Sequence, residues 1–202
     1  MNAKTLTLAS ALLIGASFAN AQVKEFKVGN AGGMKVSQVF TVDSDAQFEN
    51  FTGQTHNVEG SIKFDPAKKG GSGRIDVDLT SLDTGIALRN EHLRSEMWFN
   101  TEKYPEATFE ATGVHHKRGD LYEVTGKLTL HGVTKTIKAN CVVRYIKESE
   151  ATRKAMFKGD VLQVKTDFAI RLADFGVMIP DMAKGKVAET IQAHLNVFAQ
   201  SG

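Results

Sequence analysis

The chain has 202 residues, with 25 lysines and arginines against 23 aspartates and glutamates and a formal net charge of +2. This near-neutral balance argues against a nucleic acid partner, which would need a concentrated basic surface. Cys141 is the single cysteine and none of the six histidines has zinc-motif spacing, so neither an internal disulfide nor a metal site is predicted.

The first 21 residues are expected to be a secretory signal peptide. Lys4 supplies a positive charge, residues 6–18 form an uncharged apolar run, and residues 19–21 read Ala-Asn-Ala, an A-x-A cleavage motif. The apolar run is shorter than the ~20 residues that span a bilayer. We therefore predict one mature domain over residues 22–202, periplasmic or secreted, with no stable membrane span.

Downstream, apolar and polar residues alternate as they do in half-buried strands. The alternation runs through residues 58–64, 74–80, 107–113, 122–130, 133–146, 162–170 and 187–197, after a weaker candidate at 34–40. The His131-Gly132 reversal predicts a β-hairpin between two of these segments. Single-sided alternation with short turns predicts an all-β fold, an antiparallel sheet closed into a barrel or sandwich.

One stretch departs from this pattern and predicts a short helical insertion over about residues 84–99. Asp83 and Thr84 are candidate N-caps of this helix, and the helix cannot continue through Pro105. The apolar spacing predicts a face that carries Ile86, Asn90, Leu93 and Met97.

Small residues such as Ala111, Gly126 and Ala193 recur on the predicted inner faces of the strands. They can leave room for a ligand, or they can accommodate strand curvature and bulges. The alternation by itself leaves both possibilities open.

Several motifs carry a resemblance to a known family. They are Asp-Thr-Gly at 83–85, Arg-x-x-His-Leu-Arg-Ser at 89–95, Tyr-Pro at 104–105, Leu-Thr-Leu-His-Gly-Val-Thr-Lys at 128–135 and Asp-Phe-Gly at 174–176. In this order, over roughly residues 58–198, the chain resembles the YceI-like family of secreted bacterial proteins, described as polyisoprenoid-binding. The resemblance implies a lipocalin-like antiparallel β-barrel of about eight strands. It also implies an elongated apolar cavity that holds an isoprenoid chain, such as a quinone precursor, in the periplasm.

Side chains that point inward would line such a cavity. The candidates are Ile75, Val77, Leu79, Phe109, Val124, Leu128, Val143, Phe168, Ile191 and Leu195, with Trp98 and Phe99 at the mouth. The alternative is that they fill a solid core and that Trp98 and Phe99 only anchor the insertion.

Arg89, His92 and Arg94 are candidates for binding a polar head group. Arginine presents a forked set of donors to an anion, and histidine can donate or accept a hydrogen bond. Alternatively, the arginines hold the helix to the barrel through the carboxylates of Asp83, Glu91 or Glu96.

No catalytic residue is predicted, because Ser95 near His92 has no nucleophile elbow and the inner faces lack acid–base groups. No cofactor is expected beyond a bound isoprenoid or fatty lipid. We therefore expect a carrier for a polyisoprenoid or similar amphiphile, as a monomer or homodimer. The alternatives are a lipid-modifying enzyme using the same cavity, and a solid-core stress or interaction module without a ligand.

Overall fold

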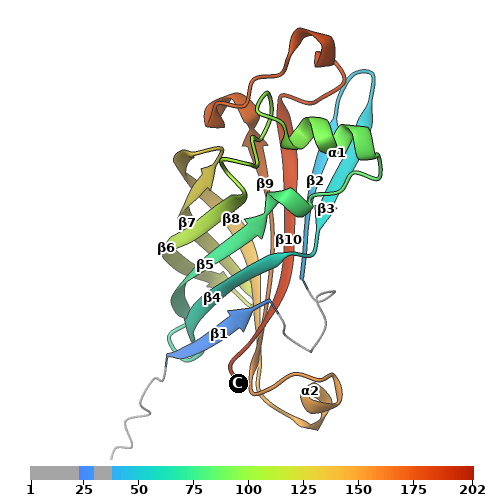
Figure 1. The fold of residues 1–202 in the computed structure, drawn as a ribbon. Helices are drawn as coiled ribbons and strands as arrows, with labels where there is room; N and C mark the ends of the chain where they lie inside the picture. Colours follow the sequence, from blue (N-terminus) through green and yellow to red (C-terminus); the bar gives the residue numbers. More distant parts are fainter. Residues whose placement is uncertain (1–22, 30–37) are drawn as a thin grey trace, which may run out of the picture.

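The computed structural model describes residues 23–29 and 38–202, so the predicted signal peptide and most of the first candidate strand lie outside the described residues. The described part is mostly β-sheet (Figure 1). Its strands are β1 (Lys24–Val28), β2 (Gln38–Asp45), β3 (Asn50–Thr55), β4 (Val58–Asp65), β5 (Gly70–Asp78), β6 (Glu106–Arg118), β7 (Leu121–Leu130), β8 (Val133–Ile146), β9 (Val161–Arg171) and β10 (Thr190–Gln200). The α-helices are α1 (Ala87–Arg94) and α2 (Glu150–Lys154), and short 3₁₀ turns cover Leu79–Ser81, Leu172–Phe175 and Asp181–Ala183.

The ten strands form one antiparallel sheet in the order β1-β4-β5-β6-β7-β8-β9-β10-β2-β3, and β1 also pairs with β10. Along β10, Val28 of β1 lies opposite Ala199, and Gln38 of β2 lies opposite Val197. β1 and β2 are therefore successive pieces of one position in the sheet. The structure is a closed eight-stranded barrel with two extra strand segments, as the family resemblance implied.

The predicted β7–β8 hairpin is confirmed. Leu130 pairs with Val133 across the turn, and the two turn residues, His131 and Gly132, both have positive φ, 51° and 74°. Two central residues with positive φ make the turn that fits the right-handed twist of the flanking strands.

β5 begins earlier than the alternation predicted, because residues 70–73 belong to the strand and not to a loop. A side chain at Gly71 would place its Cβ 2.1 Å from the carbonyl oxygen of Lys63 on β4. The glycines here allow the two backbones to approach closely, which is a second use of glycine besides turns.

α1 is shorter than the predicted helix over 84–99, and its N-cap is Ile86 instead of Asp83 or Thr84. Asp83 is unavailable because its backbone exchanges two hydrogen bonds with Gln54 of β3, at 2.8 and 2.9 Å. The extended backbone of Ser95 ends the helix at the other side.

The predicted inner face of the helix is only half correct. Asn90 and Leu93 are buried, whereas Ile86 and Met97 are 52% and 63% exposed. Both exposed residues lie outside the helix itself, so helical spacing does not govern where they point.

The two ends of the barrel are built differently (Figure 1). α1 and the connection from β9 to β10 lie at one end, the α1 end; α2 and the chain terminus lie at the other, the α2 end. Every helix among residues 23–29 and 38–202 is too short or too polar to cross a bilayer.

At the α2 end the carboxylate of Asp160 ties several chain segments together. It accepts hydrogen bonds from Lys24 Nζ, from the hydroxyl of Tyr145 at 2.7 Å and from the backbone N–H of Glu148 at 2.8 Å. Burial by itself would raise the pKa of Asp160, but these donors outweigh it and lower the pKa to about 2. Asp160, which directly precedes β9, therefore links this strand to β1 through Lys24 and to β8 through Tyr145.

Replacing Asp160 by asparagine is expected to lower the free energy of unfolding at pH 7 by roughly 2 kcal/mol, because the folded state favours the ionised carboxyl. A pKa that is depressed on folding stabilises the protein above the ordinary carboxyl pKa. That contribution is lost as the pH falls from about 4 to about 2. Denaturant unfolding of both proteins across this range measures the difference.

Asp120→Asn is the control, because its ion pair with Arg144 is exposed and should contribute little. A difference between wild type and Asp160→Asn that stays constant down to pH 2 would contradict the role of the charge.

Candidate functional site

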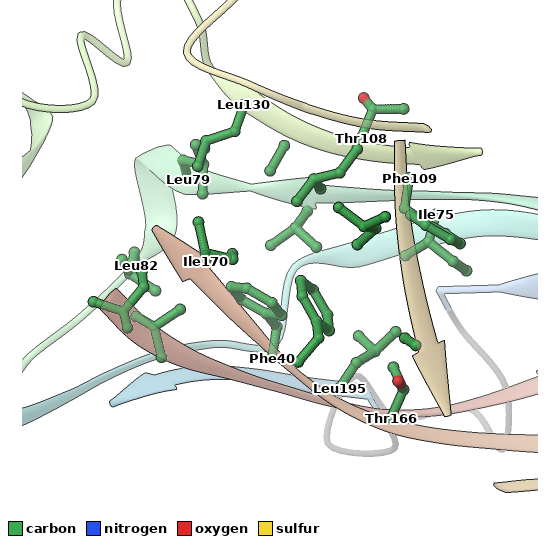
Figure 2. Close-up of a pocket in the computed structure, with 18 of the residues that line it drawn as sticks. Phe40, Ile75, Leu79, Leu82, Thr108, Phe109, Leu130, Thr166, Ile170 and Leu195 are labelled. Atoms are coloured by element: carbon green, nitrogen blue, oxygen red, sulfur yellow. The ribbon is translucent and has the colours of Figure 1, made fainter. Parts of the chain in front are cut away.

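The interior of the barrel contains two apolar chambers. The chamber nearer the α1 end has a volume of about 80 Å³, and the chamber nearer the α2 end about 100 Å³. Figure 2 shows the first of these, with Leu79 and Leu82 at one extremity and Ile75, Phe109, Thr166 and Leu195 at the other.

All the predicted cavity residues except Trp98 line these chambers. Those of the α1-end chamber are Ile75, Val77, Leu79, Phe99, Phe109, Leu128, Phe168, Ile191 and Leu195. The α2-end chamber adds Val124 and Val143, and it shares Ile75, Phe109 and Leu195 with the first.

The burial of inward-facing residues along β9 distinguishes a hollow barrel from a solid core. At the two ends of the strand, Leu162 and Ile170 are 0% and 5% exposed. Between them Val164, Thr166 and Phe168 also line the chambers, yet they are only partly buried. Side chains therefore pack both ends of the barrel, and its middle is left unfilled.

The inner faces of β8 and β9 contribute two weakly polar side chains, Cys141 and Thr166. The Thr166 hydroxyl already donates a hydrogen bond to the backbone oxygen of Asn140 at 3.1 Å. Burial raises the pKa of the Cys141 thiol, which favours its protonated form. Across residues 23–29 and 38–202, no cluster of three or more potential metal ligands could hold a metal ion.

Sequence reasoning did not select several lining residues, among them Phe40, Val42, Leu82, Leu130, Ile137, Ala139, Cys141, Thr166 and Ile170. Most of them share a face with the selected residues, so the alternation of their strands contained the signal. Leu82 had no such signal, because it lies in the turn between β5 and α1.

Trp98 and Phe99 were predicted together at the cavity mouth, and the structure separates them. After α1 the chain turns back, with the N–H of Trp98 bonded to Ser95 and that of Phe99 bonded to Leu93. Phe99 enters the α1-end chamber, whereas Trp98 is buried in a separate groove outside the barrel. Trp98 therefore packs the insertion against the barrel.

That outer groove, the α1 groove, has a volume of about 490 Å³ and lies between α1 and the β9–β10 connection. Its lining includes Glu49, Phe51, Leu88, Arg89, His92, Leu93, Trp98, Met182 and Lys186. Arg89 and His92 share this groove, as their three-residue spacing on a helix predicts.

Arg89 is largely engaged by the protein itself. Its guanidinium bonds Glu49 Oε1 at 2.6 Å and the hydroxyl and carbonyl of Thr84 at 2.9 and 3.0 Å, and it lies 4.3 Å above the ring of Phe51. The carboxylate partner is Glu49 of the β2–β3 turn, and not one of the nearby carboxylates suggested by sequence. A long-range partner of this kind has no sequence signal.

His92 and Arg94 are placed differently from Arg89. His92 is exposed in the α1 groove. Arg94 lies outside that groove, and its Nη2 donates to the backbone oxygen of Leu82 at 3.4 Å. Within the part of the chain that the structure describes, the buried Nε of Arg94 has no hydrogen-bond partner.

Asn90 positions α1 on the barrel. Its side-chain oxygen accepts from the N–H and the hydroxyl of Thr84 at 2.9 and 2.7 Å, and its amide donates to Asp83 Oδ1 at 2.6 Å. The backbone N–H of Gly85 and, after it, this amide of Asn90 donate to the carboxylate of Asp83 and lower its pKa. Since α1 has no side-chain N-cap, its attachment depends on Asn90 and Leu93.

Replacing Asn90 by alanine is expected to cost about 1 to 3 kcal/mol of stability, because the buried Asn90 loses its three hydrogen bonds to Asp83 and Thr84. The same change should raise amide hydrogen exchange selectively between residues 84 and 97. Exposed Asn140 of β8 provides the control, since Asn140→Ala should change neither quantity. Uniform exchange changes over the whole barrel would contradict a local role.

Comparisons with known proteins agree on one family. The sequence profile of a family described as "YceI-like domain" matches residues 22–199. Protein YceI of Escherichia coli O157:H7 is 37% identical over 139 residues, which are 62% of this chain and 68% of that protein. A UPF0312 protein of Photorhabdus laumondii is 47% identical over 91 residues, 44% of this chain and less than half, 46%, of that relative's length.

Solved structures share the fold. The crystal structure of Burkholderia cenocepacia BcnA has a TM-score of 0.70 at 24% identity and covers 83% of this chain and 99% of its own. A polyisoprenoid-binding domain from Saccharophagus degradans, implicated in plant cell wall breakdown, has a TM-score of 0.63 at 18% identity. It covers 90% of this chain and 100% of its own. At these identities the likeness shows the fold alone.

Proposed function

Because this chain belongs to the YceI-like family, we propose that it binds a polyisoprenoid or a similar long-chain amphiphile inside its barrel and carries it outside the cytoplasm. The observation that carries the proposal is the partly buried middle of β9, where Val164, Thr166 and Phe168 point into an unfilled apolar interior. The description of the Saccharophagus degradans domain as polyisoprenoid-binding supports the same class of ligand.

The driving force for such binding is the removal of the ligand chain from water. At ~25 cal/mol per Å², burial of about 300 Å² of apolar surface supplies roughly 7 kcal/mol before the cost of ordering the ligand. The walls need no specific polar contact with the chain, which suits a repetitive hydrocarbon.

The polar head of the ligand is assigned to the α1 end. The imidazole ring of His92 is exposed in the α1 groove and has no hydrogen bond to any other part of the chain that the structure describes. Arg94 donates from Nη2 to the backbone oxygen of the cavity residue Leu82, and its Nε has no partner among the described residues. Arg89 contributes less, because Glu49 and Thr84 already occupy its donors. The assignment thus favours His92 and Arg94 as head-group contacts.

The proposed role is binding without catalysis. A catalytic site needs a nucleophile, a base and an orienting group close together. In the chambers, the Thr166 hydroxyl is bonded to the backbone and burial raises the pKa of the Cys141 thiol, so neither is an activated nucleophile.

A periplasmic location follows from the predicted cleavage after Ala21. The family match begins at residue 22, immediately after that motif. The intact mass of the protein recovered from a periplasmic fraction is expected to correspond to residues 22–202. Recovery of the full-length chain from the cytoplasm would contradict this location.

Phe168→Asp is expected to abolish retention of a prenyl quinone, because an unpaired carboxylate in the α1-end chamber is costly to bury against a hydrocarbon chain. Native mass spectrometry after incubation with the quinone measures the bound fraction. Ala169→Asp is the matched control, since Ala169 is the next residue of β9 and is exposed on the outer face.

Equal retention by Phe168→Asp and wild type would show that the ligand does not occupy the chamber. Equal loss in both variants would point to a general effect on folding, which circular dichroism of the two proteins distinguishes.

A further inference from the structure

The two chambers of the barrel meet at a narrow ring of side chains. Five residues line both chambers, and we call them the collar: Ile75, Phe109, Cys141, Thr166 and Leu195. Four of them, all but Cys141, are labelled at one extremity of the chamber in Figure 2. Any chain that extends from one chamber into the other passes between these side chains.

The collar consists of two arcs of cross-strand neighbours. Ile75 pairs with Phe109 between β5 and β6. On the opposite arc, Thr166 of β9 pairs both with Cys141 of β8 and with Leu195 of β10. Because the positions are fixed by strand register, the size of the opening depends on the side chains and not on a mobile loop.

Neither chamber can hold a long ligand by itself. Their volumes of about 80 and 100 Å³ are below the roughly 150 Å³ of an apolar cavity that accommodates one benzene molecule. An isoprenoid chain that enters at the α1 end therefore has to cross the collar as it lengthens.

Phe109 is the largest side chain of the collar, and its ring occupies the space above Gly126 of the adjacent strand β7. A Cβ added at Gly126 would lie 2.2 Å from Cζ and 2.5 Å from Cε2 of Phe109. The missing side chain at Gly126 thus gives the ring a place along the barrel wall. Gly126 therefore has a use besides the two expected of small inward residues, which is the packing of a neighbouring aromatic ring.

We propose that the Phe109–Gly126 pair sets the length of the apolar chain that the barrel accepts, because the position of the Phe109 ring determines how far the collar opens. This inference rests on the proposed binding of an isoprenoid inside the barrel. The inference names the residue that would distinguish long from short ligands of this one chemical class.

The test is a size series at position 109: Phe109→Trp, wild type, Phe109→Leu and Phe109→Ala. Each protein is incubated with prenyl alcohols of increasing isoprene number, and native mass spectrometry identifies the longest chain retained. That longest chain is expected to increase in the order Trp, Phe, Leu, Ala, by about one isoprene unit or more over the series. Phe109→Leu keeps an apolar side chain in place, so the result does not depend on whether the alanine variant folds.

Phe48→Leu is the matched control. It makes the same change in an exposed residue of the β2–β3 turn that lines neither chamber, so the longest retained chain should stay as in wild type. An equal shift in Phe48→Leu and Phe109→Leu, or no shift along the series, would overturn the role of the collar. Retention of no prenyl alcohol by wild type would overturn the proposed function itself, and the collar inference with it.

A second measurement locates the chain directly. Cys141 is the only cysteine, so a Cys141→Ala, Val143→Cys protein carries its single thiol in the α2-end chamber. A long prenyl alcohol should protect this thiol from a small neutral thiol reagent when Phe109 is present. With Phe109→Trp in addition, protection should be lost although a short chain still binds. Equal protection in both proteins would overturn the proposal.

Discussion

Closure of the sheet is the constraint on which the rest of this structure depends. Each of the eight barrel strands pairs with a neighbour on both sides, because β1 pairs with both β4 and β10. β2 and β3 extend this sheet along β10, and the outer side of β3 has one bridge, from Gln54 to Asp83, among the described residues. A closed antiparallel sheet satisfies its backbone hydrogen bonds without any edge. The wall is therefore held together by the backbone, and the side chains in the middle of the barrel need not fill a core.

The two ends of the barrel supply the side-chain packing and hydrogen bonds that its hollow middle lacks. Phe26, Leu162 and Val197 are fully buried toward the α2 end, where Asp160 joins three strands through charged and polar donors. The α1 end is instead covered by a helix that Asn90 attaches through short side-chain bonds. The proposed function accordingly assigns the head group of the ligand to the α1 end.

The inward side chains of the barrel both allow its strands to pack together and determine the shape of its cavity. Gly126 and Phe109 are both inward residues, yet one provides space that the other occupies. The same alternation of small and large residues that closes the barrel thus shapes its cavity. Ligand selection by such a barrel would depend on a few contacts of this kind, since the remaining wall is uniformly apolar.

The sequence by itself determined the approximate positions of β4 to β10 and the β7–β8 hairpin, because alternation with a period of two residues is a local property of the chain. It predicted neither β1 nor β3, nor the first residues of β5. It also determined the family, through motifs near α1 and in the hairpin. Only the tertiary structure decided that Arg89 pairs with Glu49, that Trp98 lies outside the chambers while Phe99 lies inside, and that Asp83 belongs to the sheet and not to the helix cap. Each of these depends on segments far apart in the chain meeting in space. The same holds for the chambers, because alternation shows which side chains point inward and not whether they fill the space that they enclose.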